Sequence, residues 1–191
     1  MAKNAISEGV KALVQRHAAV AGTVVGANAY TECGNISNAD PEEAIFNKGD
    51  KFTVPAADVI ADAIFVSRLG TSKVPAVAVE MADGSAKVLY LSSMRKRVVE
   101  YEETPDGFKS KRDANGAVIS HAADTPLYKK IKNMPTAQAI LNEIAGKTYE
   151  VSDVLGPYAT SQIGTVKDEY GNESRGVVGL RNTSVCVFSE V

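Results

Sequence analysis

Two alternating runs of apolar residues, joined by an Asp-Gly turn, constrain the fold of this chain more than any other part of its sequence. In Val74–Met81 the large apolar residues alternate with Ala78 and Glu80, which is the period of a half-buried β-strand. The turn Ala82–Ser85 contains Asp-Gly, a strong signal for a tight hairpin, and a second apolar run follows at Ala86–Leu91. The sequence therefore predicts an antiparallel β-hairpin in the middle of the chain.

Shorter runs of the same kind predict further strands on both sides of this hairpin. They are Lys51–Pro55, Ala63–Leu69, Arg97–Tyr101, Lys147–Leu155, Tyr158–Val166 and Val177–Phe188. One helix is expected among them, at residues 136–145, because Ile140, Leu141 and Ile144 recur at helical spacing. Thr136 fits its N-cap.

Another helix is expected over Asn4–Val20, close to the N-terminus. Its apolar residues Ile6, Val10, Leu13 and Val14 recur at helical spacing and form one face. We interpret this helix as an assembly arm whose apolar face docks on a neighbouring molecule or on the body of the chain. Removing the first 20 residues is then expected to convert an assembly into monomers while the body stays folded.

The chain is interpreted as two regions of different character, a helical arm with its connecting loop (residues 1–50) and a β-rich body (residues 51–191). Within the body, residues 102–126 are polar and contain the turn signals Pro105–Gly107 and Ala114–Gly116, which predict a protruding hairpin. Together these elements define an α+β fold that is predominantly antiparallel β, a barrel or a sandwich with an N-terminal helix and one inserted helix. The order of a strand triplet, a helix and further strands is compatible with an OB-like barrel.

Cysteine usage and the N-terminal sequence bear on the compartment. Cys33 and Cys186 lie far apart, so the chain has no disulfide framework and fits a reducing interior. Two buried thiols are the expectation, and a single disulfide is the alternative. The apolar run Ala18–Ala29 has 12 residues, whereas a membrane span needs about 20. We therefore expect a cytoplasmic or virion protein with neither a signal peptide nor a transmembrane segment.

No catalytic or cofactor motif stands out in the sequence. The two histidines occupy unpromising places for a base, His17 on the apolar face of the first helix and His121 in the polar excursion. Nucleophile-elbow, P-loop and dinucleotide-binding patterns are missing, as are the His and Cys spacings of metal sites. We expect no enzyme, no cofactor and no metal, with a site assembled from scattered acids as the remaining alternative.

Charge is distributed unevenly along the chain. The segment from Lys87 to Lys132 holds ten basic and six acidic residues, whereas the rest of the chain holds eleven and seventeen. The ten basic residues, called here the basic patch, are Lys87, Arg95, Lys96, Arg97, Lys109, Lys111, Arg112, Lys129, Lys130 and Lys132. Opposed blocks of charge favour contacts between molecules or a local anionic ligand. Candidates for stacking on bases near the patch are Tyr90, Tyr101, Phe108 and Tyr128.

Two classes of function fit these observations. The first is a non-catalytic structural protein that self-associates, such as a virion (phage-particle) component, with copies of itself or other structural subunits as partners. Arg95, Lys96 and Arg97 would then meet acidic surface such as Glu42 and Glu43 across an interface. The alternative is a single-stranded nucleic-acid-binding protein with an OB-like barrel, in which the basic patch neutralises phosphates. No membrane partner is expected in either class.

Overall fold

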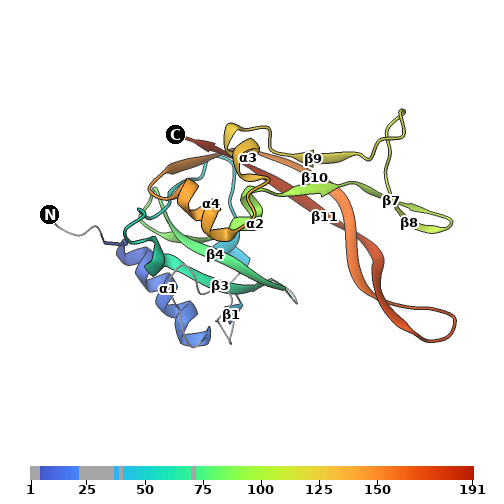
Figure 1. Cartoon of the computed structure of the whole chain (residues 1–191), viewed down its shortest axis with the longest axis horizontal. Helices are drawn as coiled ribbons and strands as arrows, with labels where there is room; N and C mark the ends of the chain where they lie inside the picture. The colour runs from blue at the N-terminus through green and yellow to red at the C-terminus, as the bar shows by residue number, and fades with distance from the viewer. Residues whose placement is uncertain (1–4, 22–36, 39–40, 70–71) are drawn as a thin grey trace. The chain divides into compact units, whose positions relative to one another are not determined.

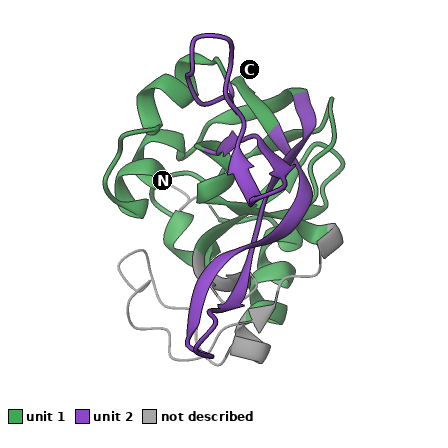
Figure 2. Ribbon diagram, turned by 90° about the vertical axis from the view of Figure 1, so that its right-hand side faces the viewer, with its two compact units in different colours: residues 1–95, 124–153, 186–191 green, residues 96–123, 154–185 purple. Residues whose placement is uncertain are grey.

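The computed structural model describes the chain in four stretches (Figure 1). They are residues 5–21, 37–38, 41–69 and 72–191. The chain divides into two compact units, coloured separately in Figure 2. Unit 1 consists of Met1–Arg95, Asp124–Asp153 and Cys186–Val191, and unit 2 of Lys96–Ala123 and Val154–Val185. The N-terminal helix and the central hairpin thus belong to the same unit.

The largest sheet has seven strands, in the order β1-β3-β4-β2-β10-β11, with β5 also paired to β4. Their bounds are β1 (Ser37–Asn38), β2 (Lys51–Thr53), β3 (Ile64–Leu69), β4 (Ser72–Met81), β5 (Ala86–Tyr90), β10 (Thr148–Lys167) and β11 (Glu173–Glu190). The predicted central hairpin is confirmed as β4–β5, in which Glu80 lies opposite Ala86. Gly84 has φ +82° in its turn, a conformation that glycine adopts readily.

The α+β class with mostly antiparallel strands is confirmed, and of the two architectures that the sequence left open, a barrel or a sandwich, the structure is compatible with the sandwich. A barrel closes when the two end strands of its sheet pair with each other. Among the described residues, β1 pairs with β3 in parallel, and β11 lies at the other end of the order, beside β10. The sheet is therefore open.

Helical segments accompany the strands of unit 1. They are α1 (Glu8–Ala21), η2 (Pro41–Ala44), η3 (Ile60–Ala63), α2 (Leu91–Met94), α3 (Pro126–Ile131) and α4 (Ala137–Ile144). The helix predicted at residues 136–145 is confirmed as α4, whose apolar residues Ile140, Leu141 and Ile144 are buried. Its predicted cap is present, because Thr136 Oγ1 accepts a hydrogen bond from Ala139 N at 3.1 Å.

Four aromatic rings gather in the core of unit 1. Phe52 of β2 lies 5.1 Å from Phe46, 5.8 Å from Tyr149 and 5.8 Å from Phe188, measured between ring centroids. All four side chains are buried. The Tyr149 hydroxyl finds no hydrogen-bond partner among the described residues. Burial, reinforced by the charges of Glu190 and Glu143, therefore raises the pKa of Tyr149.

Unit 2 contains two small two-stranded sheets, β6–β9 and β7–β8. Their bounds are β6 (Arg97–Val99), β7 (Tyr101–Thr104), β8 (Gly107–Ser110) and β9 (Ser120–Ala122). The turn predicted at Pro105–Gly107 is confirmed, because it joins β7 to β8 with Thr104 opposite Gly107. The second predicted turn lies inside a bridge between Arg112 and Val118. The polar excursion is thus ordered as successive hairpins.

The remainder of unit 2 is the outer part of β10 and β11, which form one long ribbon closed by the turn Asp168–Asn172. The sequence predicted a break in β10 at Gly156-Pro157, and that prediction is wrong. Gly156 has φ +99°, and a Cβ at this position would lie within 3.0 Å of Tyr158 and 3.2 Å of the Thr183 carbonyl oxygen. Glycine accepts this positive φ, and a proline is tolerated where a strand has a free edge, so β10 continues through both residues.

Candidate functional site

The ten residues of the basic patch are divided equally between the two units. In unit 1, four of the five bind acceptors of the same unit. The pairs are Lys87 with Asp50 (2.7 Å), Arg95 with the Met134 carbonyl (2.8 Å), Lys129 with Asp124 (2.7 Å) and Lys130 with Glu143 (2.7 Å). Lys132 is exposed. The basic residues of unit 1 are therefore mostly engaged in holding its own fold.

These contacts keep the acidic partners ionised. Partial burial alone would raise the pKa of Asp50, but hydrogen bonds from Asn47 N and from Lys87 bring that pKa below its usual value. The hydrogen bond from Lys129 lowers the pKa of Asp124. Hydrogen bonds from two lysines, Lys130 first, lower the pKa of Glu143.

Four of the five basic residues of unit 2 also bind acceptors of the same unit. The pairs are Lys96 with the Ser184 carbonyl (2.9 Å), Arg97 with Ser120 Oγ (3.0 Å), Lys111 with Glu100 (3.4 Å) and Arg112 with the Gly116 carbonyl (2.7 Å). Lys109 makes only a local contact of 3.4 Å, with Asp106 three residues away. Lys109 and Arg112 are both exposed, so their charges remain accessible to a ligand.

One of the two acidic residues expected to meet the basic patch of another molecule, Glu43, already has partners. Glu43 is engaged in its own chain, where it contacts Arg16 and lies 3.1 Å from His17 Nε2 through its Oε2 atom. The side chain of Glu42 lies outside the described residues. Arg95, as shown above, is bound to Met134.

Of the four candidate stacking residues, two lie together and two do not join them. Tyr90 is buried in the core of unit 1, which removes it as a stacking platform. Tyr128, also in unit 1, is half-buried in α3. Tyr101 and Phe108 lie on the paired strands β7 and β8, opposite Ser110 and Glu103 respectively, and therefore share one face of that hairpin.

A groove of about 560 Å³ in unit 2 brings together the predicted residues Tyr101, Phe108, Lys109 and Arg112. Glu102, Ser110 and Val177 complete its lining. Two aromatic rings beside two accessible cations are suited to a planar, anionic ligand, while Glu102 opposes it. The sequence suggested the residue types, but their meeting at one groove with Val177 of β11 depends on tertiary structure.

Another polar cluster of unit 2 was missed at the level of the sequence. His121 Nε2 lies 2.6 Å from Glu100 Oε1, and the imidazole stacks on Tyr158 with a centroid separation of 3.6 Å. The hydrogen bond with His121 is the main reason that the pKa of Glu100 is lowered. The contact with Glu100 and the stacking on Tyr158 hold this imidazole in place within unit 2.

The apolar face proposed for an assembly arm packs on the chain's own sheet. Val10, Leu13 and Val14 are 1%, 3% and 7% exposed, and α1 contacts β3, β4, β5 and η3. Ile6 is half-buried. The structure thus selects the second of the two expected docking places, the body of the chain.

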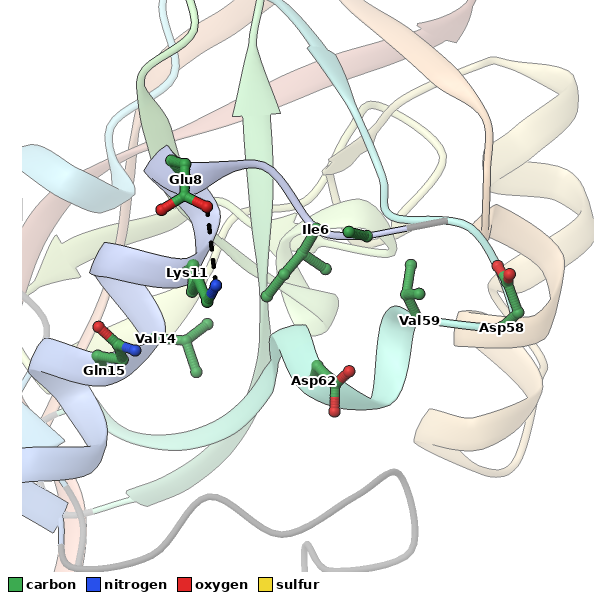
Figure 3. A pocket seen from close by; sticks show the side chains of 9 residues that line it. Ile6, Glu8, Lys11, Val14, Gln15, Asp58, Val59 and Asp62 are labelled. Carbon is green, nitrogen blue, oxygen red and sulfur yellow. Dashed lines mark ion pairs between the residues drawn. The ribbon is translucent and has the colours of Figure 1, made fainter. Parts of the chain in front are cut away.

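Beside α1 lies a groove of about 520 Å³ (Figure 3). Ile6, Val14 and Val59 contribute apolar side chains to it, and Asp58 and Asp62 lie at its η3 side. The ion pair between Glu8 and Lys11, 3.7 Å long, lies at its α1 side. Exposed carboxylates and a mixed lining make this a surface groove beside the packed helix.

His17 on α1 predicts a specific pH dependence of stability. Its imidazole is 4% exposed and stacks on Phe65 at 4.6 Å. Burial lowers the pKa of His17, and the positive charge of Arg16 acts in the same direction. Near pH 6.5 and below, the unfolded chain therefore binds a proton that the folded chain resists, so this contribution is present at pH 7 and above and is lost as the pH falls towards the lowered pKa.

We expect the free energy of unfolding to decrease from pH 7 to pH 5, and the variant His17→Phe to flatten that decrease. Phenylalanine preserves a ring against Phe65 but cannot take up a proton. Urea unfolding at pH 7, 6 and 5 measures both slopes. Equal slopes for the two proteins would contradict the assignment to His17.

The outer ribbon, residues 161–180, is a largely exposed part of unit 2. None of its residues is buried. Its exposed apolar side chains are Ile163 (50%), Val166 (38%), Val178 (44%) and Tyr170 (80%). A two-stranded ribbon is marginally stable in water unless another element covers it. This exposed apolar surface is therefore a candidate for a contact with a partner.

In the ribbon, a valine of each strand lies opposite a glycine of the other strand. A Cβ at Gly164 would lie 2.8 Å from Val178, and one at Gly176 would lie 2.9 Å from Val166. These four residues consequently share one face, and Ile163 lies on the other because side chains alternate along a strand. Both faces of the ribbon thus carry exposed apolar groups.

No known protein family, curated protein or solved structure matches this chain. Among the described residues, no helix has both the length and the apolar character that a membrane crossing demands. In the same ranges, no group of three or more His, Cys, Asp or Glu side chains is arranged to hold a metal ion. Cys33 lies outside the described residues, and Cys186 is half-buried with its Sγ 3.8 Å from the Phe46 carbonyl oxygen.

Proposed function

We propose that this protein is a non-catalytic structural subunit that self-associates, of the kind found in virions and phage particles. The observation that carries the proposal is the outer ribbon, which exposes apolar side chains on both faces and has no buried residue. Exposed apolar surface on an ordered element is typical of protein–protein contacts. The assembly element is therefore the ribbon, and α1 is part of the subunit core.

A second copy of the chain is the partner that this proposal names. Residues 161–180 nearly balance their charges, with two basic residues against three acidic ones, and Lys167 pairs with Glu173 at 3.1 Å. Unit 2 as a whole holds equal numbers of acidic and basic residues. Like charge therefore does not oppose the association of identical ribbons.

Removing the exposed apolar groups of the ribbon is expected to abolish self-association. The triple variant Ile163→Thr, Val166→Thr and Val178→Thr keeps β-branched residues and deletes apolar surface. Light scattering after size-exclusion chromatography should give an oligomer for the parent chain and about 20 kDa for the variant, since one chain has a mass of 20.2 kDa.

The matched control is Ile45→Thr, which changes an isoleucine of similar exposure, 52%, in unit 1. It should leave the oligomer intact. A parent chain that is monomeric at every concentration tested, or a triple variant that keeps the parent mass, would contradict the proposal.

The second candidate function is binding of single-stranded nucleic acid in the groove of unit 2. What supports it is the grouping of Tyr101 and Phe108 with the accessible charges of Lys109 and Arg112. Aromatic rings stack on bases of any sequence, and cations neutralise phosphates. The intramolecular contacts of most of the basic patch, together with Glu102, make this the weaker candidate.

The expected result for this candidate is that a labelled oligothymidine binds, with an affinity that falls steeply as salt is added. Stacking of about 1–3 kcal/mol per base predicts that the double variant Tyr101→Ala and Phe108→Ala binds at least about tenfold more weakly. Fluorescence anisotropy measures both effects, with the exposed Lys132→Ala as control. Unchanged affinity in the double variant would exclude the groove.

A further inference from the structure

The two strands of the ribbon differ in how their outer edges are protected. β10 pairs with β2 at Thr148, Tyr149 and Glu150, and its other neighbour is β11. Farther along, in the described part of the chain, no third strand pairs with the edge of β10 that faces away from β11. The backbone N–H and C=O groups on that edge over Thr160–Val166 are thus available to another strand.

Charge is absent from this edge of β10 and present on β11. No charged residue occurs from Tyr158 to Val166, whereas β11 carries Glu173, Arg175 and Arg181. Natural edge strands are commonly guarded against pairing by charges, prolines or bulges. Pro157 ends the open stretch on one side and Lys167 on the other. The stretch between them lacks every such guard.

We infer that the edge of β10 over Thr160–Val166 pairs antiparallel with the same stretch of a second copy, about a two-fold axis near Ile163. This inference rests on the proposed self-association and specifies its geometry. An isologous contact brings a segment against itself, so a neutral segment pairs without repulsion of like charges. Seven residues paired in this way form about one backbone hydrogen bond per residue. The lack of cations on the stretch disfavours nucleic acid as its occupant.

Cysteine scanning tests this geometry in the full chain. Single cysteines are placed at Ser161, Gln162, Ile163 and Thr165, in a background with Cys33→Ser and Cys186→Ala. Residues related by the axis come within disulfide distance only close to the axis itself. Mild oxidation should therefore give disulfide-linked dimers with a sharp maximum at one position, expected at or next to Ile163. Ser174→Cys, an exposed position on β11, is the control and should stay monomeric on a denaturing gel.

Charge complementation provides an independent test, which does not depend on disulfide formation. Ile163→Lys and Ile163→Glu should each weaken the dimer by about tenfold or more, because like charges meet at the axis. Mixing the two variants should restore the dimer, which loss of apolar surface alone would not do.

The outcomes separate the inference from the proposed function. A parent oligomer whose β10 cysteines do not cross-link, or whose β11 control does, overturns the edge pairing and leaves self-association standing. Failure of the mixed variants to restore the dimer also overturns the pairing. A monomeric parent chain overturns the proposed function itself.

Discussion

A Leu13→Asp variant is expected to be largely unfolded under conditions in which the parent chain is folded. Leu13 is 3% exposed on the face of α1 that packs on the sheet. An unpaired carboxylate at such a site costs several kcal/mol, a large part of the roughly 5–15 kcal/mol that stabilises a typical domain. Circular dichroism and urea unfolding would measure the loss. Ala12→Asp, which puts the same charge on the exposed side of the helix, should change stability by less than about 1 kcal/mol.

This result would reverse the expectation that the first helix is a dispensable arm. Gly9 provides a second test of whether α1 is packed or detached, because a Cβ there would lie 2.6 Å from the Gly84 carbonyl oxygen in the β4–β5 turn. In a detached helix Gly9→Ala would stabilise the helix by about 1 kcal/mol. In the packed helix the same change should destabilise the protein by about 1–3 kcal/mol. Parent-like unfolding of Leu13→Asp together with a stabilising Gly9→Ala would show that α1 is detachable.

Phe52→Ala is expected to lower the free energy of unfolding by about 3–5 kcal/mol. Phe52 is 1% exposed and is the ring that contacts each of the other three aromatic residues of the core cluster. Its loss leaves a cavity that β2 and its partners cannot fill, since these strands are held by pairing with β4 and β10. Chemical unfolding would give the difference directly.

Tyr149→Phe is the matched control in the same cluster. It removes only a buried hydroxyl that has no partner among the described residues, so stability should stay the same or rise. A loss of more than about 1 kcal/mol in this control would reveal a hydrogen bond to that hydroxyl. A loss of less than about 1 kcal/mol for Phe52→Ala would contradict the central position of its ring.

The sequence predicted those elements whose signals are local. Alternation and the Asp-Gly turn defined the β4–β5 hairpin, and the Thr136 cap with its following apolar residues defined α4. Both predictions depend on residues that are close together in the sequence. The prediction for β10 was wrong because Gly156-Pro157 has the local character of a break, whereas the strand continues through a glycine with positive φ.

Contacts between distant segments could not be predicted in the same way. The apolar face of α1 indicated that something covers it, but periodicity does not identify the cover. The basic patch was continuous in sequence, yet Lys87 binds Asp50, 37 residues away, and Lys96 binds Ser184, 88 residues away. For the groove, Tyr101 and Phe108 were identified by type, while the participation of Val177 follows only from the path of β11.

Unit 1 is built from three stretches that lie far apart in the sequence, and this limits how early it can fold during synthesis on the ribosome. β2 pairs with β10, and the Thr53–Thr148 hydrogen bond spans 95 residues. Phe188, a member of the aromatic cluster, is made later still. The hairpins β4–β5 and β7–β8 can form as they emerge, but the core of unit 1 cannot close until Phe188 has left the exit tunnel. During that interval Phe52 lacks Tyr149 and Phe188, two of the three rings that surround it in the folded unit, and its aromatic surface stays exposed.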